Sequence, residues 1–82
     1  MVSPRVAFAE YLDGYRIRLR FSNGDWRILD MKPYLSFGVF SRIAEMEMFK
    51  EVQVAFGTIE WPGGVDLDPD FVWDHSVPSA VR

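Results

Sequence analysis

Cysteine is missing from this chain of 82 residues, and histidine occurs once, at position 75. Without thiols the chain cannot form a disulfide framework, a thiolate metal site or a cysteine nucleophile. No stretch approaches the roughly 18 apolar residues that a membrane-spanning helix needs. The first sixteen residues also lack the uninterrupted apolar segment of a signal peptide. We therefore expect a cytoplasmic protein that does not enter a membrane.

Catalytic signatures are missing as well. The chain has no G-x-S-x-G elbow, no P-loop and no dinucleotide-binding fingerprint. His75 stands alone, and its neighbours Asp74 and Ser76 would point away from it on a helix. We expect no enzyme activity and no cofactor.

Basic residues are not in excess, and the charges are unevenly distributed. The net charge is −3, but residues 1–41 carry six Lys/Arg against four Asp/Glu, whereas residues 42–82 carry three against eight. A protein that binds nucleic acid in general usually has a basic excess. The distribution therefore argues against that class and leaves two surfaces of opposite charge.

Apolar residues are plentiful, at 49% of the chain, and 16% of residues are aromatic. A chain of this length forms one domain with a modest core. We expect a single domain over residues 1–75 and a flexible C-terminal tail over residues 76–82, where the sequence is short, polar and contains a proline.

The N-terminal third predicts three strands, at residues 5–12, 15–22 and 25–30. Asp13-Gly14 and Asn23-Gly24 separate them, and such dipeptides between alternating apolar runs indicate β-hairpins. If both are two-residue turns, Leu12 opposes Tyr15. The core face then carries Val6, Phe8, Glu10, Ile17, Leu19, Phe21, Trp26 and Ile28. The opposite face carries Ala7, Ala9, Tyr11, Arg16, Arg18, Arg20, Arg27 and Leu29.

The rest of the chain predicts two short helices around a second hairpin. Ser41 is a candidate N-cap for a helix that buries Ile43, Met46 and Phe49. Strands flanking Gly57 place Val52, Val54 and Phe56 on one face, and residues 68–76 predict a terminal helix. The fold class is α+β: a three-stranded antiparallel meander, a short helix, a second β-hairpin and a short C-terminal helix, βββ-α-ββ-α.

Three carboxylates alternate in "WPGGVDLDPD", residues 61–70. They match the first part of a calcium-binding loop, but Phe71 and Val77 occupy the positions that need Gly and Glu. The architectural interpretation is stronger: Asp68 caps the terminal helix, Pro69 opens it and Asp70 lies in its first turn. We expect no metal here, and we expect Asp66 to accept hydrogen bonds from backbone N–H groups of the turn.

The arginines of the meander are the second candidate site. In the predicted register Arg16, Arg18, Arg20 and Arg27 project from one sheet face, where guanidinium groups could bind carboxylate or phosphate. The alternative is a solvated face whose arginines pair with acids of the same chain. Direct nucleic-acid binding is less favoured, since Tyr11 is the one aromatic residue predicted on that face.

The segments "YRIRLRFSNGDWRILDM", "GVF", "MFKEVQV" and "GTIEWPGGVDLDPDFVW" resemble the small bacterial DUF2442 family over about residues 3–74. Gly63 stands where the family's turn is expected to have Asn. The family motif residues are Trp61, Pro62, Gly64, Asp66, Leu67, Asp68, Pro69 and Asp70, and their expected role is structural. The resemblance implies no established catalytic residue, and it implies a suspected toxin–antitoxin-like pairing with a second small protein.

Our leading hypothesis is a non-enzymatic protein-interaction or accessory module with a protein partner or a homo-oligomeric state. The alternative is a nucleic-acid-associated transcriptional regulator that uses the arginine face. A weaker alternative is a small enzyme or metal-binding protein with an acidic site at Asp66 to Asp70.

Overall fold

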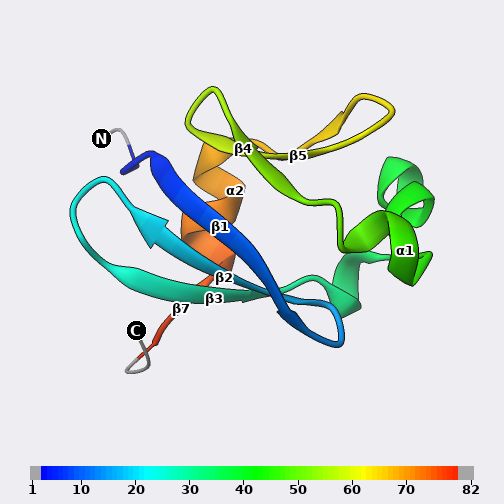
Figure 1. Ribbon diagram of the computed structural model, residues 1–82, viewed down its shortest axis with the longest axis horizontal. Coiled ribbons are helices and arrows are strands. Elements are labelled where there is room, and N and C mark those ends of the chain that lie inside the picture. The colour runs from blue at the N-terminus through cyan, green and yellow to red at the C-terminus, as the bar shows by residue number, and fades with distance from the viewer. Residues whose placement is uncertain (1–2, 80–82) are drawn as a thin grey trace.

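The computed structural model describes residues 3–79, which form two antiparallel sheets joined by short helices (Figure 1). The larger sheet has the order β1-β2-β3-β7, and the smaller sheet has the order β4-β5-β6. The strands are β1 (Val6–Asp13), β2 (Arg16–Phe21), β3 (Trp26–Asp30), β4 (Gln53–Ala55), β5 (Thr58–Trp61), β6 (Val65–Asp66) and β7 (Val77–Pro78). The 3₁₀ helices η1 (Lys32–Tyr34) and η2 (Gly38–Ile43) precede α1 (Met46–Phe49), and α2 (Pro69–His75) lies before β7. The predicted α+β class is confirmed.

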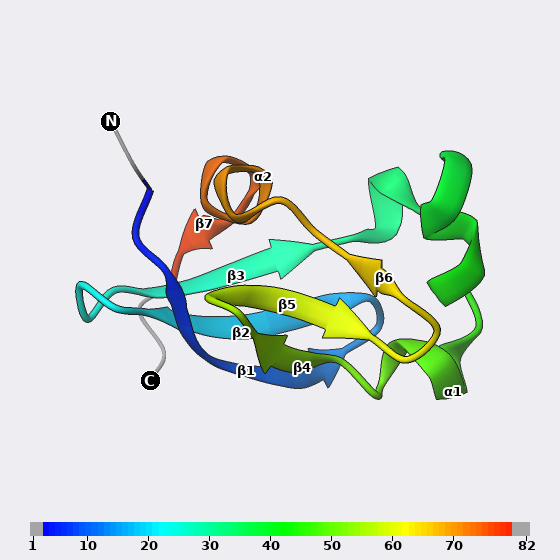
Figure 2. The same cartoon turned by 90° about the horizontal axis from the view of Figure 1, so that it is seen from above.

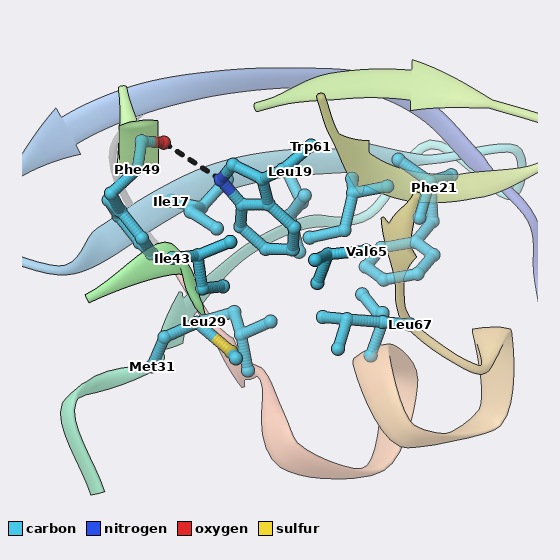
Figure 3. Close-up of a cluster of buried hydrophobic side chains, with 13 residues drawn as sticks. Ile17, Leu19, Phe21, Leu29, Met31, Ile43, Phe49, Trp61, Val65 and Leu67 are labelled. Atoms are coloured by element: carbon cyan, nitrogen blue, oxygen red, sulfur yellow. Dashed lines mark hydrogen bonds between the residues drawn. The ribbon is translucent and has the colours of Figure 1, made fainter. Parts of the chain in front are cut away.

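The core lies between the inner face of the larger sheet, the smaller sheet and α2. Seen from above, α2 lies beside β3 and β7 while β4 and β5 lie beside β1 (Figure 2). The Trp61 ring stands amid the buried side chains (Figure 3). The fully or nearly fully buried apolar residues are Val6, Ile17, Leu19, Phe21, Leu29, Met31, Ile43, Phe49, Ile59, Trp61, Val65, Leu67 and Val72.

The first hairpin turns one residue later than predicted. Asp13 pairs with Arg16, so Gly14 and Tyr15 form the two-residue loop and the predicted pair of Leu12 with Tyr15 is wrong. The register then shifts between Tyr11 and Asp13, which makes Leu12 the extra residue of a bulge.

The β2–β3 hairpin has a three-residue loop instead of the predicted two-residue turn. Phe21 N–H donates to the Asp25 carbonyl at 2.9 Å, and Gly24 N–H donates to the Phe21 carbonyl at 2.8 Å. Gly24 has a φ of +90°, the left-handed conformation that closes a three-residue loop with a bulge. Arg20 therefore pairs with Trp26, and every side chain of β3 changes face relative to the prediction.

The predicted core face is consequently right for β2 and wrong for β3. Ile17, Leu19 and Phe21 are buried as predicted. Trp26 and Ile28 were assigned to the core, but they lie on the outer side with Arg18 and Arg20. Six further residues exchange sides. Phe8 and Glu10 lie on the outer side, opposite Arg20 and Arg18. On the inner side, Leu29 is buried, Tyr11 packs against Phe49, and Ala9 and Arg27 lie opposite Leu19.

The middle of the chain contains more 3₁₀ than α structure. Ser41 lies inside η2, where its hydroxyl donates to the Gly38 carbonyl at 2.9 Å, so its predicted role as N-cap is wrong. The helix α1 has four residues and begins after Glu45. The predicted burial of Ile43 and Phe49 is confirmed.

The β4–β5 hairpin closes in a two-residue loop made of Phe56 and Gly57, both with positive φ. Phe56 thus belongs to the turn, and the prediction that it shares a strand face with Val52 and Val54 is wrong. The three-residue loop between β5 and β6 contains Pro62, and every peptide bond within residues 3–79 is trans.

The terminal helix is confirmed, and ordered structure continues beyond it. Asp68 caps α2 by accepting a bond from Asp70 N–H at 2.8 Å. In the predicted tail, Ser76 is buried, β7 pairs with β3, and Ser79 N–H donates to the Trp26 carbonyl at 2.9 Å. Residues 80–82 of that segment lie outside the described residues. Within residues 3–79 no helix is long and apolar enough to cross a membrane.

Candidate functional site

The outer side of the larger sheet combines arginine with large apolar side chains. We call it the outer sheet face and define it by Phe8, Glu10, Arg18, Arg20, Trp26, Ile28 and Val77. Period-two alternation points these side chains away from the core, since Ile17, Leu19 and Leu29 between them are fully buried. Phe8 is 40% exposed and Val77 is 58% exposed, whereas Trp26 and Ile28 are half-buried.

Trp26 is the centre of this face. The guanidinium carbon of Arg18 lies 5.0 Å from the indole centroid, and that of Arg20 lies 5.6 Å from it. The Phe8 ring meets the indole edge-on at a centroid distance of 5.9 Å. Cation–π contacts at exposed sites contribute about 0.5–1 kcal/mol each, so these neighbours hold the indole in a defined orientation.

The two arginines differ in charge compensation. Arg18 Nη2 contacts Glu10 Oε1 at 2.5 Å, across the β1–β2 pair. Arg18 Nε is buried and has no hydrogen-bond partner among residues 3–79. Arg20 is exposed, and within residues 3–79 no carboxylate forms an ion pair with it. Arg20 is therefore the cation of this face that remains available to an external carboxylate.

Arg16 lies at the far end of β2 and is paired locally. Its Nε and Nη2 donate to the two Asp13 carboxylate oxygens at 2.7 and 2.8 Å. This bidentate contact lowers the pKa of Asp13 below its ordinary value and raises that of Arg16. The pair joins the end of β1 to the start of β2 beside the Gly14-Tyr15 turn.

Arg27 is not part of the arginine face, which corrects the prediction. Because the side chains of β3 lie on the faces opposite to those predicted, Arg27 points inward, toward the end of α2. Its Nε donates to Ser76 Oγ at 2.7 Å, and its Nη2 donates to the Ser76 carbonyl at 2.6 Å and to the Trp73 carbonyl at 3.3 Å. Its guanidinium also lies 4.2 Å from the centroid of the Trp73 ring. Arg27 thus joins β3 to the end of α2.

The acidic motif divides into a helix start, core residues and the carboxylate of Asp66 on β6. Trp61 and Leu67 are buried, and Asp68 with Asp70 forms the helix start. Asp66 is exposed on β6 opposite Glu60, and no hydrogen bond to its carboxylate is found in the described part of the chain. The predicted bonds from the turn to Asp66 are therefore not formed. Among the described residues, no three His, Cys, Asp or Glu side chains gather closely enough to hold a metal ion.

Pro62, Gly64 and Pro69 complete the motif. Pro62 and Gly64 lie exposed in the loop that joins β5 to β6, and Arg42 Nη2 donates to the carbonyl of that loop's Gly63 at 2.8 Å. Pro69 is the first residue of α2, where a missing N–H leaves no bond unmade. These residues shape the backbone that brings Trp61 and Leu67 into the core.

His75 belongs to an aromatic cluster at the end of α2. Its ring stacks on Phe71 at a centroid distance of 4.1 Å and meets Tyr34 edge-on at 5.4 Å. The His75 Nδ1 atom lies 3.0 Å from the Phe71 carbonyl, one helical turn earlier.

A small hollow opens beside the outer sheet face, between the start of β3 and β7. Its volume is about 210 Å³, and its lining residues are Gly24, Asp25, Trp26, Arg27, Pro78 and Ser79. Pockets that enclose small organic ligands usually measure about 300–1,000 Å³. The face therefore offers a surface for contact rather than a deep cavity at this edge.

The members of this face that the sequence reasoning placed in the core are Phe8, Glu10, Trp26 and Ile28. For Trp26 and Ile28, the signal that could have placed them is the glycine at position 24. An Asn-Gly dipeptide suits a two-residue turn, but a Gly that follows two turn residues also suits the three-residue loop with a bulge. The longer loop puts Trp26 opposite Arg20.

Residues 6–78 match one protein family, described as a protein of unknown function, DUF2442. No curated protein and no solved structure shows a match.

Proposed function

Because this chain belongs to the DUF2442 family, whose description assigns no activity, we propose a function from its surface: a non-enzymatic module that binds a partner protein through the outer sheet face. The observation that carries the proposal is the environment of Trp26. A half-buried indole contacts two guanidinium groups and an exposed phenyl ring on the side of the sheet that faces away from the core.

This composition supports a role in binding another protein. Aromatic residues and arginine are enriched at the centre of interfaces, where they contribute most of the binding energy. Phe8, Trp26, Ile28 and Val77 provide apolar area, and the sheet keeps their positions fixed before a partner arrives. Little conformational entropy is then lost on binding.

The charge of the face indicates the chemistry of the partner. Glu10 neutralises Arg18, so Arg20 is the charge left for an intermolecular contact. A partner with an apolar patch and a carboxylate positioned over Arg20 would complement the face, and a guanidinium–carboxylate contact of this kind is directional.

The test is co-purification from the native host followed by calorimetric titration of the purified partner. Trp26→Ala and Arg20→Glu should each weaken binding by about tenfold or more, because both remove a central contact. Lys32→Glu is the matched control, since it makes the same charge change at an exposed position outside the face. Absence of any partner at physiological salt, or equal losses for Arg20→Glu and Lys32→Glu, would reject the proposal.

A second candidate function is binding of single-stranded nucleic acid by the same face. Bases stack on aromatic side chains of sheet surfaces, and Trp26 lies within 6 Å of two cations there, at 5.0 and 5.6 Å. The Glu10 contact to Arg18 and the net charge of −3 favour the protein partner. Titration with oligonucleotides of mixed sequence at low salt separates the two functions. If the face binds nucleic acid, the oligonucleotides should quench the indole fluorescence of the wild type but not that of Trp26→Ala. The affinity should also fall steeply as the salt concentration rises.

A further inference from the structure

Phe56 is the large apolar side chain that is most exposed to solvent among the described residues, at 90%. It lies at the tip of the β4–β5 hairpin (Figure 1), as the first residue of a two-residue loop. Its φ is +53°, and that of the following Gly57 is +76°. The ring therefore projects from the end of a tight turn and contributes little to the core.

The backbone conformation of Phe56 is unfavourable for a bulky residue. Turns with two positive φ angles strongly prefer Asn, Asp or Gly at the first position, because a side chain there crowds the backbone. A non-glycine residue held in such a conformation suggests a function for that side chain when the fold does not use it. With nine tenths of its surface in water, the Phe56 ring is such a side chain.

The turn is braced from the start of β1. Arg5 Nη2 donates to the Phe56 carbonyl at 2.9 Å, and Val6 N–H donates to the Gly57 carbonyl at 2.8 Å. A Cβ atom at Gly57 would lie 2.5 Å from Arg5 Nε, so the guanidinium packs directly on that glycine. Arg5 is itself anchored, since its N–H donates to Ser22 Oγ at 3.1 Å and its carbonyl accepts from Ser22 N–H at 2.7 Å.

We infer that Phe56 is a docking anchor that inserts into an apolar pocket of a partner protein, with carboxylates at the rim of that pocket facing Arg5. These hydrogen bonds fix the turn before a partner binds, so little conformational entropy is lost on binding, as is typical of a side chain that anchors an interface. Arg5 is exposed, and no carboxylate of the described residues forms an ion pair with it, so its charge is available beside the ring.

This inference goes beyond the proposed function, because the hairpin tip is a different surface from the outer sheet face. The tip and the β2–β3 loop lie toward the same end of the molecule (Figures 1 and 2). A single partner that covers this end could reach both Phe56 and Trp26.

Photo-crosslinking in the native host tests the inference. The photoreactive residue p-benzoyl-phenylalanine replaces Phe56 in the full chain, and a matched chain carries it at Phe37, which is 63% exposed with an ordinary φ of −101°. We expect one discrete adduct from position 56 that position 37 does not give. Peptide mapping should place the crosslink in a partner segment whose apolar residues are flanked by Asp or Glu.

An additional Arg5→Gln change keeps a donor for the Phe56 carbonyl but removes the charge. It should lower the adduct yield by about fivefold, as expected for the loss of a charged contact beside a central anchor. The inference is overturned by the absence of an adduct, by adducts shared with position 37, by an adduct to a second copy of this chain, or by an unchanged yield in Arg5→Gln.

The two proposals can fail separately. If the adduct forms as expected but binding does not depend on Trp26 and Arg20, the outer sheet face is the wrong surface and the Phe56 anchor stands. If binding depends on Trp26 and Arg20 but position 56 gives no adduct, the anchor is rejected and the proposed function stands.

Discussion

The indole Nε1 of Trp61 donates a hydrogen bond of 2.9 Å to the backbone carbonyl of Phe49 (Figure 3). Both residues are buried, and their rings also lie 5.7 Å apart. The carbonyl belongs to the last residue of the four-residue helix α1, whose acceptors have few partners within so short a helix. The contact therefore connects β5 to an element that has little stability of its own.

Replacing Trp61 by Phe should lower the free energy of unfolding by about 2–4 kcal/mol, because it opens a cavity and removes the shorter of the two hydrogen bonds to the Phe49 carbonyl. The bond that remains is a 3.3 Å contact from Val52 N–H. Urea unfolding measures the change. The matched control is Trp26→Phe on the outer sheet face, where we expect a loss of less than about 1 kcal/mol. Equal losses for the two variants would contradict a special role for the Trp61 hydrogen bond.

Arg27→Lys should lower the free energy of unfolding by about 1–3 kcal/mol, because an ammonium group cannot reproduce the forked contacts to Ser76 Oγ and the Ser76 carbonyl. Hydrogen exchange should show faster opening at Ser79 N–H, which pairs with β3 beside this contact. Arg20→Lys serves as the control and should change neither measurement. An unchanged exchange rate at Ser79 would show that Arg27 does not hold the C-terminal strand.

Phe56→Asn should raise the free energy of unfolding by about 0.5–1.5 kcal/mol, since Asn adopts a positive φ more readily than Phe. Chemical denaturation of the purified chain measures it without any partner. Phe37→Asn is the control and should give no gain, because the φ of Phe37 is −101°. A loss of stability in Phe56→Asn would mean that the ring supports the fold.

Asp68→Ala should cost about 1 kcal/mol, because the N-cap bond from Asp70 N–H is lost. Asp66→Ala should change stability by less than about 0.5 kcal/mol, since this exposed carboxylate makes no hydrogen bond among the described residues and lies opposite Glu60. Thermal unfolding of both variants makes the comparison. A larger cost at Asp66 than at Asp68 would reopen the functional interpretation of the acidic motif.

The pH dependence of stability should include a small contribution from Asp13. The hydrogen bond from Arg16 is the main cause that lowers the pKa of the Asp13 carboxyl below its ordinary value of 3.8. Because the folded pKa is the lower one, the ion pair stabilises the fold fully above pH 3.8, and this contribution is lost as the pH falls through the folded pKa. The pair is solvent-exposed, so the effect is small and salt-sensitive. Carboxyl NMR titration measures it, and Arg16→Gln should return the pKa of Asp13 toward 3.8.

Short-range sequence patterns were sufficient to predict several parts of the fold. Ile17, Leu19 and Phe21 alternate with arginines, and their burial follows from period two alone. Asp68, Pro69 and Asp70 specify the start of α2 by side-chain chemistry within one turn. In both places the determining interactions lie within a few residues of each other.

The predictions were wrong where the length of a loop or the tertiary packing determines the direction of a side chain. The Asn23-Gly24 pair fits two loop lengths. The longer loop, which the structure has, turns Arg27 away from the predicted binding face and toward Ser76, 49 positions along the chain. Nothing near Arg27 in the sequence identifies that partner. Similarly, Ile43 and Phe49 are buried as predicted, but they reach the core from separate short helices.

The three-residue loop at Gly24 also affects how this domain can tolerate insertions and deletions. Exposed loops usually accept length changes readily. Here the loss of one residue would leave a two-residue turn and reverse the faces of the β3 side chains. Trp26 and Ile28 would then point into the core, and Leu29 would point to solvent. The β2–β3 loop should therefore be intolerant of single-residue length changes, although Ser22, Asn23 and Gly24 are all exposed.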